Sequence, residues 1–232
     1  MLYTPKVVYT GLESQGKSLA LARDALTMAR HCQYLKEKYG IHRLLFSNLI
    51  FSDDFYNKYK DFIRYFSNID EIVNKVGCFV IIDELSLYFS SLKNEPLPDN
   101  VNRWLRQGAK QGVFIRGSAQ EFHDLHVQFR RRVFSAYHCV KLVGSPRPAV
   151  NTPNSSRSVW GLIRLRPLVI NPYDELNPRY HFSLPPFDCI RITKQLVSIF
   201  NTSQVIGDVT PLPFKHIERS CPICDYKKIY HT

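Results

Sequence analysis

The sequence lacks any apolar run long enough to cross a membrane. A membrane-spanning helix needs roughly 20 consecutive apolar residues, and no stretch of the 232 residues approaches that length. The opening residues, MLYTPKVV, have neither the basic region nor the long apolar region of a secretory signal. We therefore expect a protein of the cytoplasm.

Cysteines are few and mostly isolated. Of the six, the four that precede Cys221 stand alone in apolar or aromatic surroundings, which indicates reduced, structural thiols. Cys221 and Cys224 form the pair CPIC, which has the spacing of half a zinc site, and His216 and His231 lie near enough in sequence to complete it. Zn²⁺ is a candidate cofactor here, with a redox pair and an unliganded tail as alternatives.

Acidic residues are scarce in one part of the chain. Residues 101–170 hold twelve Lys or Arg against only Glu121 and Asp124, whereas the other residues include 19 basic and 18 acidic ones. Such a basic segment favours binding to nucleic acid, because neutralising phosphates releases counterions and gives affinity independent of base sequence. A solvated basic face, or one that binds an acidic lipid or protein, stays an alternative.

The stretch GLESQGKS, residues 11–18, has the spacing of a phosphate-binding loop. Its glycines let backbone N–H groups wrap around phosphate oxygens, Lys17 would reach the terminal phosphates of ATP, and the Ser18 hydroxyl would bind Mg²⁺. An apolar run precedes the loop and a helical pattern follows it, as a phosphate site at a helix N-terminus requires. The expected nucleotide contacts are Gly11, Ser14, Gln15, Gly16, Lys17, Ser18 and Leu19.

A second apolar run ends in two acidic residues. In CFVIIDE, four apolar residues precede Asp83 and Glu84, and the carboxyl ends of parallel strands open into one crevice. Asp83 would hold the Mg²⁺ shell and Glu84 would polarise an attacking water. Two consecutive acids fit ATP hydrolysis better than phosphate transfer by a kinase, and NKVG, residues 74–77, lacks the aspartate of a guanine-binding motif.

A third apolar run, VFIRGSAQ, ends in Gln120. An amide at that place can hydrogen-bond water and phosphate together and so respond to hydrolysis. The alternative is a solvated glutamine that caps the next helix.

The periodicity of apolar residues predicts alternating strands and helices. The expected strands cover 6–10, 43–48, 78–84, 113–120 and 134–143, and the expected helices cover 17–39, 69–76, 100–111 and 121–132. This order predicts an α/β fold, a P-loop NTPase with a mostly parallel central sheet and helices on both faces. One more strand or a hairpin is expected within 158–170, with Arg164 and Arg166 on one face.

Three segments together resemble a known family. They are YTGLESQGKS, GCFVIIDELSLYFSS and VNRWLRQGAKQGVFIRGSAQEFHDLHVQFRRRV. In order and spacing they are similar to the zonular occludens toxin-like and filamentous-phage assembly ATPases of the FtsK–HerA superfamily. The similarity covers residues 3–206, with Ala119 in place of the family's Thr before Gln120, and with Phe200 and Asn201 in place of its Tyr and Asp.

The resemblance implies a RecA/FtsK–HerA-like fold and a motor that hydrolyses ATP, with Mg²⁺, to act on DNA. Such motors are rings, typically hexamers, in which one subunit supplies an arginine to the ATP of its neighbour. The candidates here are Arg106 and Arg130, together with Arg103, Arg131 and Arg132. We expect residues 1–206 to form the ATPase domain and 207–232 a C-terminal tail.

Filamentous-phage assembly proteins carry a membrane-spanning segment after the ATPase core, and we find none here. This favours a viral or mobile-element motor for genome packaging, or an assembly ATPase whose anchor is a separate chain. Implied partners are viral capsid or membrane assembly proteins, and the implied location is the host cytoplasm or the virion. Two other functions stay open, a nucleotide or small-molecule kinase and a non-hydrolysing DNA-binding protein with a zinc tail.

Overall fold

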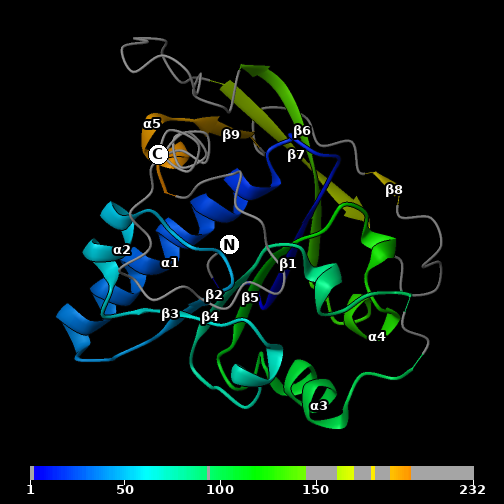
Figure 1. The fold of residues 1–232 in the computed structure, drawn as a ribbon, viewed down its shortest axis with the longest axis horizontal. Coiled ribbons are helices and arrows are strands. Elements are labelled where there is room, and N and C mark those ends of the chain that lie inside the picture. Colours follow the sequence, from blue (N-terminus) through cyan, green and yellow to red (C-terminus); the bar gives the residue numbers. More distant parts are fainter. Residues whose placement is uncertain (1–2, 93–94, 145–160, 170–178, 181–188, 200–232) are drawn as a thin grey trace, which may run out of the picture.

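A twisted sheet runs through the computed structural model, which describes residues 3–92, 95–144, 161–169, 179–180 and 189–199 (Figure 1). The strands are β1 (Lys6–Thr10), β2 (Leu45–Ser47), β3 (Ile63–Tyr65), β4 (Phe79–Ile82), β5 (Phe114–Ser118), β6 (Ser135–Gly144), β7 (Gly161–Val169), β8 (Arg179–Tyr180) and β9 (Cys189–Ile192). Their spatial order is β3-β2-β4-β5-β1-β6-β7-β8, and β9 also pairs with β7.

The first six strands pair in parallel, and β7, β8 and β9 join the sheet through antiparallel pairs. The predicted mostly parallel sheet is therefore confirmed. Two edges matter below: the carboxyl edge, at which β1, β4 and β5 end, and the amino edge, at which they begin. Because β5 lies between β1 and β4, the three predicted site segments meet at the carboxyl edge.

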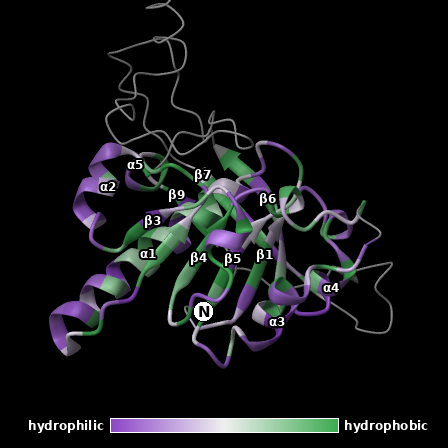
Figure 2. Cartoon of the chain, turned by 60° about the horizontal axis from the view of Figure 1, so that its bottom comes forward, coloured by the Kyte–Doolittle hydropathy of each residue, from purple (hydrophilic) through white to green (hydrophobic). Residues whose placement is uncertain are grey.

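Helices cover both faces of the sheet, as predicted. They are α1 (Lys17–Tyr39), α2 (Asp53–Tyr59), α3 (Asp99–Gln107), α4 (Val127–Arg130) and α5 (Lys194–Val197), with 3₁₀ turns η1 (Ile69–Glu71), η2 (Leu85–Leu87) and η3 (Phe122–Asp124). Figure 1 shows α1, α2 and α5 on one side and α3 and α4 on the other, and each side has its own apolar cluster. Figure 2 shows hydrophobic residues concentrated on the central strands between them.

The helix α1 has the bounds that the sequence predicts, because glycines fix both ends. Gly16 precedes it with φ 97°, and Gly40 ends it with φ 67° while its N–H donates to carbonyls of the last turn. Both dihedrals lie in the left-handed region that glycine adopts without cost. In the described part of the chain no helix is both long and apolar enough to cross a membrane.

Three predicted helices are shorter than expected. The helix predicted at 69–76 is only the turn η1, since Asn74 and Gly77 adopt positive φ and end it. The helix predicted at 100–111 ends at Gln107. The helix predicted at 121–132 is divided into η3 and α4, because Leu125 is extended and forms a bridge with Ser90. In the last case a contact distant in sequence overrides the local pattern.

Candidate nucleotide site

The loop between β1 and α1 is fixed by close packing against β6 and β7. A Cβ on Gly11 would lie 2.8 Å from the carbonyl oxygen of Cys139, and one on Gly16 would lie 2.3 Å from Cδ1 of Ile163. Both positions also have positive φ, 136° and 97°. The glycines of the motif are therefore required by space as well as by backbone conformation.

The side chain of Lys17 lies across this loop. Its Nζ donates to the carbonyl oxygens of Gly11 at 2.6 Å and Leu12 at 3.1 Å. Gln15 is tied to the neighbouring strand, since its Oε1 accepts from the backbone N–H of Lys141 at 2.9 Å. Glu13 is exposed. The loop thus holds the Lys17 ammonium group on its inner side and exposes the Glu13 carboxylate to solvent.

Asp83 lies opposite the start of α1. The Ser18 hydroxyl donates to its Oδ2 at 3.5 Å, and the Ser118 hydroxyl donates to its Oδ1. Asn48 binds the Asp83 backbone twice, donating to the carbonyl oxygen and accepting from the N–H, both at 2.8 Å. Residues at the ends of β2 and β5 and at the start of α1 thus orient the carboxylate that follows β4.

The sequence reasoning missed Asn48 and Ser118. A signal was present, because polar residues stand at or just after the carboxyl ends of β2 and β5, where this edge of the sheet collects them. Their role depends on a contact 35 residues away in sequence, which periodicity does not reveal.

The oxygen atoms of Ser18 and Asp83 suit a hard divalent cation. Burial raises the pKa of Asp83 above its ordinary value, and the Ser118 hydrogen bond opposes that rise. A buried carboxylate beside a hydroxyl is the kind of donor set that Mg²⁺ accepts. The residues present therefore fit the predicted ion.

Glu84 has a backbone conformation uncommon for a residue with a side chain. Its φ of 56° lies in the left-handed region, where a non-glycine residue costs about 1–3 kcal/mol. Its N–H donates to the Ser118 hydroxyl at 3.0 Å, and its Oε1 accepts from the Ser86 hydroxyl at 2.7 Å. Strain of this kind gathers where surrounding structure fixes a functional geometry.

Gln120 joins β5 to the phosphate loop. Its carbonyl oxygen accepts from the Gly11 N–H at 3.0 Å, and the residue is exposed to solvent. A displacement of the end of β5 therefore reaches the first residue of the loop through one hydrogen bond.

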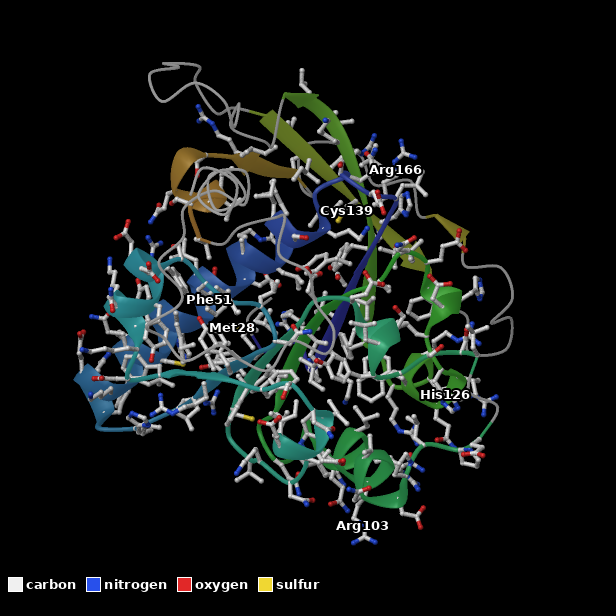
Figure 3. All side chains as sticks on the ribbon, in the orientation of Figure 1. Met28, Phe51, Arg103, His126, Cys139 and Arg166 are labelled. Carbon is white, nitrogen blue, oxygen red and sulfur yellow. The ribbon has the colours of Figure 1, made fainter. Side chains whose placement is uncertain are left out.

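His138 of β6 is a third residue that the sequence reasoning missed. Its Nδ1 lies 3.4 Å from the Thr10 hydroxyl, and its cross-strand partner on β7 is Arg166. The pKa of His138 is lowered, first by burial and then by the positive charges of Arg166 and Lys17. Figure 3 shows Arg166 and Cys139 beside the loop that joins β1 to α1. One wall of the site is therefore cationic.

The candidate arginines lie at different places. Arg103 projects from α3 into solvent (Figure 3). Arg130 places an Nη1 atom 2.7 Å from Nδ1 of His123, three residues after Gln120, and its Nε is buried without a hydrogen-bond partner among the described residues. Arg106 lies in the last turn of α3 and acts electrostatically on Arg132. Arg130 thus contacts the turn that follows Gln120, whereas Arg106 acts on the residue that follows α4.

The thiols of the described residues are free, as predicted: Cys32, Cys78 and Cys139 are buried and Cys189 is half-buried. The pair Cys221 and Cys224, both histidines near it, and the segment with Phe200 and Asn201 lie outside the described residues. Within the described ranges no group of three His, Cys, Asp or Glu residues is placed to hold a metal ion.

Solved structures are similar to this chain in fold. The N-terminal domain of zonular occludens toxin from Neisseria meningitidis superposes with a TM-score of 0.51 at 18% identity, over 85% of this chain and 100% of that one. The chain has the fold of that domain. The zonular occludens toxin-like resemblance is therefore confirmed at the level of the fold, and the α/β, P-loop NTPase class with it.

Other solved structures match less closely than the zonular occludens toxin domain. B204, the DNA-packaging ATPase from Sulfolobus turreted icosahedral virus, has a TM-score of 0.41 at 17% identity over 60% of this chain and 76% of that one. The ATPase domain of G40P has a TM-score of 0.41 at 11% identity over 86% of this chain and 85% of that one. No protein-family model and no curated protein matches the sequence.

Proposed function

We propose that this protein is an ATP-hydrolysing motor that moves DNA during genome packaging or virion assembly of a virus or mobile element. One observation carries the hydrolytic part. Ser18 at the start of α1 is 3.5 Å from the Asp83 carboxylate, and Glu84 follows at the end of the same strand. This arrangement supports phosphate binding, a divalent cation and a base for water at one edge of the sheet.

In the proposed reaction the loop N–H groups and Lys17 bind the phosphates of ATP. Ser18 and Asp83 would hold Mg²⁺, which would neutralise phosphate charge when bound. Glu84 accepts a proton from a water molecule while the oxygen of that water attacks the γ-phosphorus. The bond between the γ-phosphorus and the oxygen that bridges it to the β-phosphate then breaks, leaving ADP and inorganic phosphate. The Gln120 amide would hydrogen-bond the water and the phosphate.

The partner and the assembly are the finer part of the proposal. The surplus of basic residues in 101–170 supports DNA as the partner. A ring, a hexamer in the proposal, would let Arg130 or Arg106 complete the ATP site of a neighbouring subunit. We place the ATPase domain at 1–206 and a tail at 207–232, with Cys221 and Cys224 as its candidate zinc ligands, and the motor in the host cytoplasm or virion beside capsid or membrane assembly proteins.

Release of phosphate from ATP, with and without DNA, tests the proposal. Lys17→Ala should abolish turnover, and Glu84→Gln should lower it by at least 100-fold, in the range ascribed to general bases, while nucleotide binding persists. Glu13→Gln, in the same loop but exposed, is the matched control and should behave as wild type.

Normal turnover in Lys17→Ala would overturn the proposal. Transfer of the γ-phosphate to a nucleoside or small-molecule acceptor would instead identify a kinase. DNA binding without any hydrolysis would identify a binding protein. Negative-stain microscopy with a non-hydrolysable ATP analogue and DNA tests the ring.

A further inference from the structure

A buried lysine lies at the amino edge of the sheet, at the opposite end of β1 from the phosphate loop. Lys6 is 4% exposed, and no carboxylate of the described residues lies within 4 Å of its ammonium group. Burying a cation costs free energy unless an anion or hydrogen-bond acceptors compensate it. The stem of Lys6 is buried while its ammonium nitrogen keeps contact with solvent, so the charge is open to an anion from outside the described residues.

The charged groups next to Lys6 are also cations. Burial and the positive charge of Arg132 lower the pKa of Lys6 to about 8. The pKa of Arg132 is lowered in turn by burial and by the charges of Arg106 and Arg131. Arg106 comes from α3 and the other two follow α4, where Arg132 donates to the Gln128 carbonyl oxygen, so the positive charge that acts on Lys6 comes from elements distant in sequence.

An exposed aromatic ring completes the group. The parallel register pairs Val7 with Ser135, which places Phe134 beside Lys6, and the Phe134 N–H donates to the Lys6 carbonyl oxygen at 3.0 Å. Phe134 is 70% exposed, so the faces of its ring are accessible to a stacking partner. We call these five residues, Lys6, Arg106, Arg131, Arg132 and Phe134, the amino-edge cluster.

We propose that the amino-edge cluster binds single-stranded nucleic acid, with its cations on the backbone phosphates and Phe134 stacked on a base. Cations that track phosphates, next to an aromatic ring that stacks on bases, are the two elements by which proteins hold a single strand. In a duplex the base faces are covered, so the ring would have no such partner. The choice of a nucleic acid as the anion rests on the proposed function.

The cluster does not overlap the phosphate loop. Lys6 and Thr10 are the two ends of β1, and a strand rises about 3.3 Å per residue, so the two sites are roughly 13 Å apart along the strand. Strand binding and basal ATP turnover can therefore be measured separately.

Fluorescence anisotropy with a labelled oligothymidine tests the proposal on the full chain without nucleotide, at 50 mM salt. Phe134→Ala should weaken binding about 5- to 100-fold, the range for loss of one stacked base. Lys6→Met, which keeps the buried stem, should weaken it on the order of 5- to 10-fold and lower the slope of log K against log salt by about 0.7.

The matched controls are Leu142→Ala and Lys58→Ala, an apolar residue and a cation that are exposed elsewhere, the cation outside the basic segment 101–170. Both should bind as wild type, and thermal unfolding should show every variant folded. A labelled duplex should bind more weakly than the oligothymidine, and Phe134→Ala should leave that binding unchanged.

Equal weakening in Leu142→Ala and Phe134→Ala would overturn the proposal, as would a preference for duplex. A change of oligomeric state in Phe134→Ala with unchanged oligothymidine binding would identify the cluster as a contact between copies of the chain. Basal phosphate release in Phe134→Ala should equal that of wild type. A wild-type chain without turnover would refute the proposed motor and leave the binding result standing.

Discussion

At the scale of single residues, the Asp83 carboxylate owes its position to side chains that never touch the nucleotide in the proposal. Ser118 holds one carboxylate oxygen, and Asn48 holds the backbone on both sides of the residue. Preorganisation of this kind is what an ion site needs, because a displaced ligand weakens binding of the metal.

Asn48→Ala should therefore lower both the stability of the fold and the affinity for Mg²⁺. It leaves the Asp83 N–H and carbonyl without these partners, which should lower the free energy of unfolding by about 1–3 kcal/mol. The Mg²⁺ concentration for half-maximal ATP hydrolysis should rise. Denaturant unfolding and a Mg²⁺ titration measure the two effects, with the exposed Asn57→Ala as control. An unchanged Mg²⁺ requirement would reduce Asn48 to a structural residue.

At the scale of elements, a buried polar network joins α1 to β1 and β5. Asp24 of α1 accepts from the Tyr9 hydroxyl at 2.6 Å and pairs with the Arg116 guanidinium at 3.2 Å, and Arg116 is 2% exposed. Burial, followed by the negative charge of Asp24, raises the pKa of Tyr9 above its ordinary value. The helix that begins at the phosphate loop is thus tied to the strand that ends near Gln120.

Loss of the Asp24 charge should be costly. Asp24→Asn leaves Arg116 buried without its carboxylate, which should lower the free energy of unfolding by about 3–5 kcal/mol. The double change Asp24→Leu with Arg116→Met should restore part of it, because apolar groups then replace both charges of that pair while Arg23 and the Tyr9 hydroxyl still lose Asp24. The exposed pair of Lys36 and Asp61 provides the contrast, and Asp61→Asn should lower the free energy of unfolding far less, because solvent screens that pair. Equal losses in Asp24→Asn and Asp61→Asn, measured by urea unfolding, would contradict this account.

How well the sequence predicts an element depends on whether its cause is local. The bounds of β1 and α1 follow from an apolar run and two glycines, and both elements were predicted at the places where they lie, with the end of the helix expected at about Tyr39. The break at Leu125 follows from its bridge to Ser90, and β9 exists through its pairing with β7. Neither contact is visible in the local sequence pattern, so neither the break at Leu125 nor the strand β9 was predicted.

The candidate site divides in the same way. Lys17, Ser18, Asp83 and Glu84 stand in motifs whose spacing carries the chemistry. His138 enters only because β6 lies beside β1, and Arg106 lies beside Arg132 only because α3 and α4 cover the same face. These placements follow from strand order and helix packing. The sequence predicted a mostly parallel sheet with helices on both faces, but not which strands and helices lie next to each other.

At the scale of the whole molecule, two apolar clusters share one sheet, so the faces should unfold together. Cys32 and Cys139 belong to one cluster and Cys78 to the other. Burial raises the pKa of each of the three thiols to about 12, which keeps them unreactive while the sheet is closed.

Thiol labelling of single-cysteine variants, with every other cysteine changed to Ser, tests this cooperativity. The three thiols should show one common free energy of protection. ATP at 100 times its Kd should raise the free energy of protection of each thiol by about 2.7 kcal/mol, because ATP binds only the folded state. Earlier labelling of Cys78 than of Cys139 would show that the two faces open separately.

The position of β1 has a mechanical consequence. The strand is paired in parallel on both sides, with β5 and with β6, and it carries Lys6 at one end and the phosphate loop at the other. A pull on Lys6 along the strand would load both ladders in shear, so that many hydrogen bonds resist together instead of breaking one at a time. The strand would then change little in length under tension, and it would transmit force from a nucleic acid bound at Lys6 to the nucleotide site.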